Sequence, residues 1–293
     1  MSNQEMQEAK KRLPAYFVRE LSGYYDEMEA RNIAHWVIED LTGMDMLKLF
    51  TGKDEAWNKD ELDRIIVILE RLRAGEPIQY ILGYAEFYGL DLKLGPGVLI
   101  PRNETEELLE WIISENIDRA DGFRILDIGC GSGAIAITLA KELPGAEVVA
   151  VDISEVALRI CEENADKNSV RVSCSYFDIL NPSGKLADQD YDLIISNPPY
   201  VLESQKPFLE NRVKEMEPSL ALFVPDTNPL LFYNAIAAFA KERLKPGGEV
   251  YVEINDLLGQ ETLKEFSLIF SDLELRQDIN GKDRMIKASN EKK

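Results

Sequence analysis

Hydrophobic and polar positions recur with helical spacing through the first 75 residues. In residues 60–75, acidic side chains occupy the first turn, arginines occupy the last turn, and Gly75 follows as a stop signal. Three shorter amphipathic patterns precede this segment, and they cover residues around 5–21, 25–41 and 43–50. The pattern predicts a small N-terminal helical bundle over residues 1–76.

The pattern changes at Pro77. Residues 77–102 are rich in β-branched, aromatic and glycine residues, and they predict short strands or a β-hairpin that links two domains. Helical spacing returns from Asn103, where either Asn103 or Thr105 is a suitable N-cap. We therefore expect a helical domain, a β-hairpin linker and a third region, residues 103–293, that begins with a helix.

After Gly122, short apolar runs alternate with helical patterns. The apolar runs predict strands over residues 123–129, 147–153, 170–177, 191–196 and 248–254. Helical patterns lie near residues 133–143, 155–167, 228–243 and 258–270. Buried strands that alternate with helices indicate an α/β fold, with a doubly wound, mostly parallel sheet covered on both faces. Near the C-terminus, residues 273–279 and 283–289 flank an Asn-Gly turn signal, which predicts an antiparallel pair at one sheet edge.

Charge and composition exclude several classes of protein. The net charge of −20 over 293 residues disfavours binding to phosphate backbones, although an acidic surface also serves solubility alone. His35 is the only histidine, which argues against a histidine metal centre or a Ser-His triad, and no metal is expected. Cys130, Cys161 and Cys174 form no disulfide framework, and no membrane-length apolar run or signal-peptide core is present. We expect a cytoplasmic protein that acts as a monomer.

A glycine-rich loop joins the first strand of the alternating region to its helix. Gly129, Gly131 and Gly133 permit a tight turn and close approach of the backbone to a ligand. Asp152 ends the next strand, where a carboxylate can accept both hydroxyls of a ribose. Because alanine follows the third glycine, the loop also fits the dinucleotide pattern, and an NAD enzyme stays open. Asp127 favours S-adenosylmethionine instead, because a carboxylate at that strand end suits an ammonium better than a pyrophosphate.

The third predicted strand ends at an aromatic ring and a carboxylate that suit an adenine. Phe177 could stack on the ring and Asp178 could accept its amino hydrogens, with Ile179 adjacent, although a packed strand end with a solvated acid is the alternative. The candidate cofactor-binding residues are Asp127, Gly129, Cys130, Gly131, Ser132, Gly133, Asp152, Ile153, Phe177, Asp178, Ile179 and Asn197.

The sequence Asn-Pro-Pro-Tyr, residues 197–200, follows the predicted strand 191–196. Ligands of open α/β sheets bind beyond the carboxyl ends of the strands, so we expect Asn197 to face the same crevice as the glycine loop. Pro198 forces an extended conformation on the residue before it, and prolines offer no N–H. The Asn197 side-chain oxygen and the Pro198 carbonyl then form a rigid pair of acceptors for a planar NH2 group. The candidate catalytic residues are Asn197, Pro198 and Tyr200, and the candidate substrate-binding residues are these three and Pro199. A simple strand terminator is the alternative.

These motifs resemble those of the HemK/PrmC family of class I S-adenosylmethionine-dependent methyltransferases. The matching stretches are PIQYILGYAEFYGL, VLIPRNETEELLE, LDIGCGSGAIAI, VDIS, SNPPYV, EPSLALF and LKPGGEVYVEI, in the expected order behind a helical N-terminal domain. Asn-Pro-Pro-Tyr alone is shared with DNA adenine methyltransferases. The segment IPRNETE together with PIQYILG is more specific to this family.

The resemblance implies methyl transfer from S-adenosyl-L-methionine to the glutamine of the Gly-Gly-Gln motif in peptide chain release factors, with S-adenosyl-L-homocysteine as product. It implies that residues 129–133, Asp152 and residues 178–179 hold the cofactor, that residues 197–200 hold the target glutamine, and that the N-terminal bundle helps to dock the protein substrate. The family often carries an aromatic residue where this chain has Ile179. Arg102 and Glu106 also fit the family pattern, and we expect a structural role for them first.

Three alternatives stay open. A ribosomal-protein glutamine methyltransferase is the nearest, and the IPRNETE segment favours release factors over it. A DNA adenine methyltransferase would need a basic face, which a chain with a net charge of −20 does not offer obviously. A non-catalytic binding protein that kept the fold would have no need of the Asn-Pro-Pro-Tyr edge.

Overall fold

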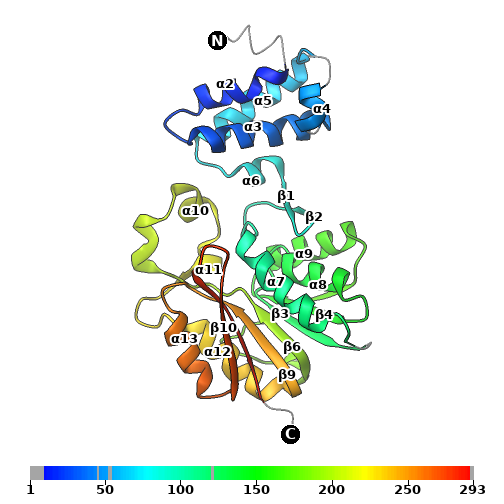
Figure 1. Ribbon diagram of the computed structural model, residues 1–293, viewed down its shortest axis with the longest axis vertical. Coiled ribbons are helices and arrows are strands. Elements are labelled where there is room, and N and C mark those ends of the chain that lie inside the picture. The colour runs from blue at the N-terminus through cyan, green and yellow to red at the C-terminus, as the bar shows by residue number, and fades with distance from the viewer. Residues whose placement is uncertain (1–9, 45, 52–54, 120–121, 291–293) are drawn as a thin grey trace. The chain divides into compact units, whose positions relative to one another are not determined.

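The part of the chain up to Gly83 forms a helical unit with its own hydrophobic core (Figure 1). A computed structural model describes residues 10–44, 46–51, 55–119 and 122–290. The helices of this unit are η1 (Lys10–Arg12), α2 (Leu13–Glu20), α3 (Glu27–Thr42), α4 (Met46–Thr51), α5 (Lys59–Arg73) and α6 (Ile78–Leu82). The predicted N-terminal helical region is confirmed, while residues 5–9 and 45 of the predicted helices lie outside the described residues.

Polar caps define where the two longest helices of this unit begin. The Asp26 carboxylate accepts the Glu29 N–H at 2.8 Å, which satisfies a donor that the first turn of α3 leaves unpaired. At α5, Asn58 accepts the Glu61 N–H at 2.9 Å, and Glu61 accepts the Asn58 N–H at 2.8 Å. This reciprocal pair is a capping box, and it fixes the backbone at the start of α5.

A β-hairpin opens the second unit, which begins at Tyr84. The strands β1 (Tyr84–Phe87) and β2 (Leu90–Lys93) pair antiparallel within the predicted linker region. The residues before them differ from the prediction, because 78–82 form helix α6 and not a strand. Pro77, with φ near −60°, pre-sets the backbone ahead of α6, and Gly83 at φ 84° ends it. The two units therefore divide after Gly83, seven residues later than the division placed at residue 76, and the hairpin belongs to the second unit.

A seven-stranded sheet forms the centre of the second unit. Its strands are β3 (Arg124–Ile128), β4 (Glu147–Asp152), β5 (Val172–Tyr176), β6 (Tyr191–Ser196), β9 (Leu244–Glu253), β10 (Asp272–Gln277) and β11 (Asp283–Ser289). Their order is β10-β11-β9-β6-β3-β4-β5. Neighbours from β9 to β5 are parallel, whereas β11 pairs antiparallel with both β9 and β10. The predicted α/β fold, with an antiparallel pair at one edge, is confirmed.

Helices cover both faces of this sheet (Figure 1). One face carries α7 (Asn103–Asn116), α8 (Ala134–Glu142) and α9 (Glu155–Lys167), and the other carries α12 (Leu231–Arg243) and α13 (Gly259–Ser267). Successive side chains of β9 alternate between the two cores: Val250 and Val252 pack with α12 and α13, whereas Tyr251 packs on the side of α7 and α8. This alternation directs Glu253, the last residue of β9, toward the α7 side.

The chain between β6 and α12 contains only short elements. They are β7 (Val201–Leu202), η3 (Glu203–Phe208), α10 (Asn211–Met216), α11 (Ser219–Leu222) and β8 (Phe223–Val224), while η2 (Lys185–Asp188) precedes β6. The strand β7 pairs in parallel with β8, which brings the residues after Asn-Pro-Pro-Tyr next to the segment after α11. In the described part of the chain, no helix combines the length and the apolar character needed to span a bilayer.

Candidate active site

A cavity of about 390 Å³ lies at the carboxyl ends of β3, β4, β5 and β6. Its volume falls within the range of roughly 300–1,000 Å³ that is typical of small-molecule sites. The predicted site residues that line it are Gly129, Gly131, Asp152, Ile153, Phe177, Asp178, Ile179, Asn197, Pro198 and Pro199. The fold therefore brings the glycine loop, the ends of two further strands and the Asn-Pro-Pro edge around one space.

A larger hollow of about 940 Å³ lies at the opposite end of the sheet. Its lining includes Arg124, Glu147 and Arg171, which stand at or near the amino ends of β3, β4 and β5. Open α/β sheets bind ligands at the carboxyl ends of their strands. We therefore assign the candidate site to the smaller cavity, which also holds the glycine loop.

Backbone hydrogen bonds fix the glycine loop against β4. The N–H groups of Gly129 and Cys130 both donate to the Val151 carbonyl, at 2.8 and 3.0 Å. The Gly131 N–H donates to Asp152 Oδ2 at 3.0 Å. Gly131 lies at φ 54°, a left-handed conformation that favours glycine. The loop thus presents its backbone at the cavity wall while its own donors stay paired.

Asp152 holds both the loop and the start of α9. Its Oδ2 accepts the Gly131 N–H, and its Oδ1 accepts the Ser154 N–H at 2.8 Å. Burial raises the pKa of the Asp152 carboxyl, and hydrogen bonds from the backbone N–H groups of Gly131, Ser154 and Ile153 oppose that rise. A carboxylate oxygen has more than one lone pair, so Asp152 retains acceptor capacity at the cavity edge.

Asp127 lies beneath the loop and does not line the cavity. It is fully buried, and its Oδ2 accepts the Ala136 N–H at 3.2 Å in the first turn of α8. Its Oδ1 has no donor among the described residues. Burial raises the pKa of Asp127 to about 8, and the nearby Asp152 charge adds to that rise. A buried carboxyl oxygen without a hydrogen-bond donor therefore lies directly behind the loop.

Three other predicted cofactor residues also stay outside the cavity lining. Cys130 and Ser132 are buried, and the Ser132 carbonyl accepts a hydrogen bond from Asn164 on α9 at 2.9 Å. Gly133 begins α8, where a Cβ would lie 2.6 Å from Cys161 Sγ. These loop residues support the turn from below, and the structure does not place them against the cavity.

Phe177 and Asp178 form the cavity wall after β5. The Phe177 ring packs edge-on against Phe239 of α12, with ring centroids 5.5 Å apart. Asp178 accepts the Leu180 N–H at 2.9 Å and the Asn181 side-chain amide at 2.8 Å. The wall is therefore held in place before any ligand binds, although part of the acceptor capacity of Asp178 serves its own turn.

Asn197 and Pro198 stand between the main cavity and a second, smaller one of about 40 Å³. The smaller cavity is lined by Leu99, Arg102, Asn197, Pro198, Tyr200, Val201, Ala221 and Leu222. Neither Asn197 Oδ1 nor the Pro198 carbonyl accepts a hydrogen bond from the described part of the chain. Two residues whose oxygens keep free lone pairs thus line both cavities.

A buried polar network holds the other side of Asn197. Asn197 Nδ2 donates to Thr105 Oγ1 at 3.2 Å, and the Thr105 hydroxyl donates to Glu253 Oε2 at 2.6 Å. Tyr200 donates its hydroxyl hydrogen to Glu253 Oε1 at 2.9 Å. The prediction that Asn103 or Thr105 is the N-cap of α7 is wrong: Arg102 occupies the N-cap position, α7 begins at Asn103, and no side chain caps the helix.

The phenol of Tyr200 stays protonated. Burial and the charge of Glu253 raise the pKa of Tyr200 well above its usual range. The hydroxyl already donates its hydrogen to Glu253, and the Tyr200 carbonyl accepts a hydrogen bond from Asn255 at 2.9 Å. Tyr200 is therefore anchored at both ends, and it is no general base.

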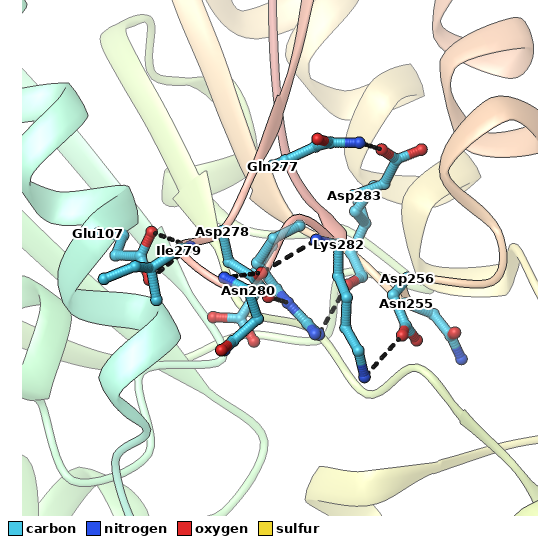
Figure 2. A network of polar contacts seen from close by, with 12 residues as sticks. Glu107, Asn255, Asp256, Gln277, Asp278, Ile279, Asn280, Lys282 and Asp283 are labelled. Atoms are coloured by element: carbon cyan, nitrogen blue, oxygen red, sulfur yellow. Dashed lines mark hydrogen bonds and ion pairs between the residues drawn. The ribbon is translucent and has the colours of Figure 1, made fainter.

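The turn between β10 and β11 supports the segment directly after β9 (Figure 2). Asp278 accepts the Lys282 backbone N–H at 3.0 Å, and the Lys282 ammonium pairs with Asp256 at 3.2 Å. Glu107 of α7 accepts the Ile279 N–H at 3.0 Å from the same turn. The turn therefore connects α7 to the end of β9, the two elements that carry the network behind Asn197.

Arg102 and Glu106 both have structural partners. Arg102 pairs with Glu217 at 2.5 Å, and Glu217 also accepts the Ile100 N–H at 3.1 Å. Glu106 accepts the Tyr88 N–H at 2.6 Å, which ties the β1–β2 hairpin to α7. Arg102 in addition lines the smaller cavity beside Asn197.

Comparisons with known proteins agree with this fold. The family model described as methyltransferase small domain matches residues 108–216, and the one described as PrmC N-terminal domain matches residues 15–83. Among solved structures, the hMettl16 catalytic domain has a TM-score of 0.54 at 15% identity, with 82% of this chain and 85% of that chain covered. The 16S rRNA methyltransferase RsmC of T. thermophilus has a TM-score of 0.52 at 20% identity, with coverage of 71% and 49%. These two likenesses show the fold alone.

Curated relatives match nearly the whole chain. The release factor glutamine methyltransferase of Bacteroides thetaiotaomicron is 44% identical over 282 residues, which cover 95% of this chain and 99% of that protein. The protein of the same name from Flavobacterium psychrophilum is 41% identical over 276 residues, with coverage of 93% and 96%. The chain belongs to the release factor glutamine methyltransferase family.

Proposed function

We propose that the chain transfers a methyl group from S-adenosylmethionine to the side-chain amide nitrogen of a glutamine in a peptide chain release factor. One observation carries this proposal: Asn197 Oδ1 and the Pro198 carbonyl, both with free lone pairs, stand where the main cavity meets the smaller one. A cofactor in the first space and an amide in the second would meet at this edge. The family to which the chain belongs supports the same reaction.

The residues around the main cavity fit S-adenosylmethionine. Asp152 retains acceptor capacity suited to ribose hydroxyls, and the wall of Phe177 and Ile179 is apolar enough for a purine. The orphaned Oδ1 of Asp127 lies directly behind the glycine loop. A cationic amino group bound at the loop would favour the ionised form of this carboxyl, whereas a phosphate there would oppose it. We therefore favour S-adenosylmethionine over NAD, and we propose direct contact for Gly129 and Gly131 and support from below for Cys130, Ser132 and Gly133.

The reaction needs orientation more than acid–base chemistry. When bound, S-adenosylmethionine supplies the methyl group, so that one N–C bond forms, one C–S bond breaks and one amide proton leaves for solvent. The lone pair of an amide nitrogen is delocalised and weakly nucleophilic. Asn197 Oδ1 and the Pro198 carbonyl can each accept one N–H of the glutamine, which aims the nitrogen into the main cavity and stabilises the positive charge that develops on it.

The described side chains at this edge suit a catalyst without a base. Tyr200 stays protonated because Glu253 and burial hold its proton, so we propose that its ring packs beside the target amide. Pro199 removes a donor that would otherwise compete for the same acceptors. We further propose that the N-terminal helical unit helps to dock the protein substrate. The cytoplasmic location and the monomeric state stay predictions.

A partition assay tests the proposed substrate. Wild-type protein is incubated with labelled S-adenosylmethionine and equal amounts of a release factor, a ribosomal protein or adenine-containing DNA. We expect label on the release factor, and none on a release factor in which alanine replaces the glutamine of Gly-Gly-Gln. Label on the ribosomal protein would favour the nearest alternative, and label on DNA would overturn the assignment to a protein substrate.

A further inference from the structure

Three side chains from separate segments form a chain of hydrogen bonds that ends at the proposed catalytic amide. Glu253 ends β9, Thr105 lies in the first turn of α7, and Asn197 follows β6. The distance is 2.6 Å from Thr105 Oγ1 to Glu253 Oε2 and 3.2 Å from Asn197 Nδ2 to Thr105 Oγ1. Neither Thr105 nor Glu253 lines either of the two cavities, so both act behind the reaction space.

The Thr105 hydroxyl determines which group donates and which accepts in each of these hydrogen bonds. A threonine hydroxyl has one hydrogen to donate and two lone pairs. Because the Thr105 hydrogen goes to Glu253, only lone pairs face Asn197. The Asn197 amide must then turn its NH2 toward Thr105, and its Oδ1 lies on the opposite side of the amide.

Glu253 is placed to be an acceptor only. The alternation of β9 directs its carboxyl to the α7 side, where 1% of the residue is exposed to solvent. Its two oxygens accept hydrogens from two different hydroxyls, those of Thr105 and Tyr200, and Arg284 of β11 supplies a positive charge nearby. An ionised carboxylate with two such donors gives each hydroxyl a single orientation.

We propose that Thr105 and Glu253 are positioning residues that lock the Asn197 amide with Oδ1 presented to the substrate. This inference rests on the proposed function and deepens it, because the lock determines which substrate group is accepted. An oxygen at that edge attracts the NH2 of glutamine and repels the carboxylate of glutamate. With the amide flipped, the edge would present an NH2 group, and its preference would reverse.

A set of threonine variants tests the lock. Thr105→Val keeps the shape and removes the hydroxyl, whereas Thr105→Ser keeps the hydroxyl. We expect Thr105→Val to lower the single-turnover rate about 10- to 100-fold, since a small misplacement of a catalytic group can cost about 100-fold. The dissociation constant for S-adenosylmethionine should not change, and Thr105→Ser should retain most of the rate. Equal loss in both variants, or no loss in Thr105→Val, would refute the role of the hydroxyl.

A matched control separates the lock from general stability. Thr262 on α13 is also fully buried, and its hydroxyl donates to the Leu258 carbonyl at 2.8 Å. Thr262→Val therefore removes one buried helix hydroxyl far from the Asn-Pro-Pro-Tyr edge in sequence and outside both cavity linings. It should leave the rate unchanged. A loss of rate that simply follows the loss of stability across both variants would contradict the proposal.

A double-mutant cycle tests whether Thr105 acts through Asn197. In an Asn197→Ala background the lock has nothing to hold, so Thr105→Val should cause no further loss of rate. Losses that multiply would show that Thr105 acts independently of Asn197, and the proposal would fail. The wild-type rate on the release factor reports separately on the proposed function, so the two failures are distinguishable.

A measurement without substrate keeps the test independent of the reaction. Protein labelled with 15N-asparagine shows the side-chain NH2 signal of Asn197, which the Asn197→Asp variant identifies by its loss. We expect this signal to shift in Thr105→Val and to stay in place in Thr262→Val. An unchanged Asn197 signal in Thr105→Val would overturn the lock, whichever substrate the enzyme takes.

The pH profile gives a further readout that a merely structural contact would not move. Burial raises the pKa of Glu253, the hydroxyl hydrogen bonds and Arg284 oppose this rise, and Glu104 adds to it, with the Tyr233 phenol also nearby. As the pH falls, protonation of Glu253 frees the Thr105 hydrogen to capture Asn197 Oδ1. Turnover should therefore show an acid limb that Glu253→Gln lacks, and an unchanged acid limb in that variant would contradict the lock.

Discussion

Replacing Gly133 with alanine tests how closely the glycine loop packs on α9. Gly133 lies at φ 84°, and a Cβ there would be 2.6 Å from Cys161 Sγ and 2.8 Å from Ile137 Cδ1. The left-handed conformation costs alanine about 1–2 kcal/mol. Overpacking of a core costs about 1–3 kcal/mol. We therefore expect Gly133→Ala to lower the free energy of unfolding of the second unit by about 2–5 kcal/mol.

Gly89→Ala is the matched control for this prediction. Gly89 has φ 67° in the two-residue turn between β1 and β2, where Tyr88 also has a positive φ of 49°, so both residues adopt the left-handed conformation of a type I′ turn. No heavy atom lies within 4 Å of the would-be Cβ of Gly89. It should show only the backbone cost of about 1–2 kcal/mol. Urea unfolding followed by Trp111 fluorescence, in a background with phenylalanine at Trp36 and Trp57, reports on the second unit. A shift in midpoint at constant slope measures each loss.

Two outcomes would refute the packing argument for Gly133. Equal losses in Gly133→Ala and Gly89→Ala would mean that the loop yields freely to the added methyl group. A second test adds Cys161→Ala, which removes the sulfur that the new Cβ would strike. If the cost of Gly133→Ala did not shrink in that background, the clash with Cys161 would not be its cause.

Three further predictions concern the site and its supports. Asp152→Ala should weaken the binding of S-adenosylmethionine by about 10- to 100-fold in calorimetry, because a hydrogen bond to a charged acceptor is worth about 1.5–3 kcal/mol. Unchanged binding would exclude Asp152 from the cofactor site. Arg102→Ala leaves the buried Glu217 carboxylate without its cation, so chemical unfolding should show a free energy of unfolding lower by about 1.5–3 kcal/mol. An unchanged midpoint would mean that solvent replaces the ion pair. Asp278 has a lowered pKa, because hydrogen bonds from Lys282 and Arg284 outweigh the effect of burial. The Asp278 carboxylate should therefore contribute fully to the free energy of unfolding above its unfolded pKa of about 3.9, and this contribution should disappear as the pH falls through the lower folded value. The difference in stability between wild type and Asp278→Asn should close only in acid. A difference that closed near neutral pH would contradict this prediction.

The sheet and the position of the Asn-Pro-Pro-Tyr edge could be predicted from local pattern. Apolar runs such as 191–196 are buried on both faces, and a proline pair ends a strand wherever it occurs. Strand ends of a parallel sheet share one edge, which is why Gly129, Asp152 and Asn197 were predicted to lie together and now line one cavity.

The partners behind Asn197 could not be predicted in the same way. Thr105 and Glu253 are 148 residues apart, and their contact depends on how α7 crosses the end of β9. Threonine is a common N-cap residue, so Thr105 was predicted to cap the helix, but its hydroxyl donates to a carboxylate from another element. One signal was available: by strand alternation, Glu253 in the run 248–254 falls on the same face as the aromatic Tyr251.

The orientation of the glycine-loop residues also could not be predicted from the local sequence pattern. The sequence indicates a tight glycine turn, but it does not indicate which side of the turn faces the ligand. Asp127 and Cys130 stay predictions as cofactor-binding residues, because both are buried beneath the loop and neither lines the cavity. Helix α6 was missed for a related reason, because five residues between Pro77 and Gly83 are too few to show a helical period.

The most direct test of the account is the single-turnover rate of methyl transfer to a release factor by wild type and by Asn197→Ala, at saturating S-adenosylmethionine. We expect methylation of the glutamine amide by wild type and a rate about 100- to 1,000-fold lower in the variant, which is the usual cost of removing one preorganised polar group from a reaction centre. The affinity for S-adenosylmethionine should stay nearly unchanged. A variant that transfers methyl at the wild-type rate would contradict the central claim that Asn197 orients the target amide.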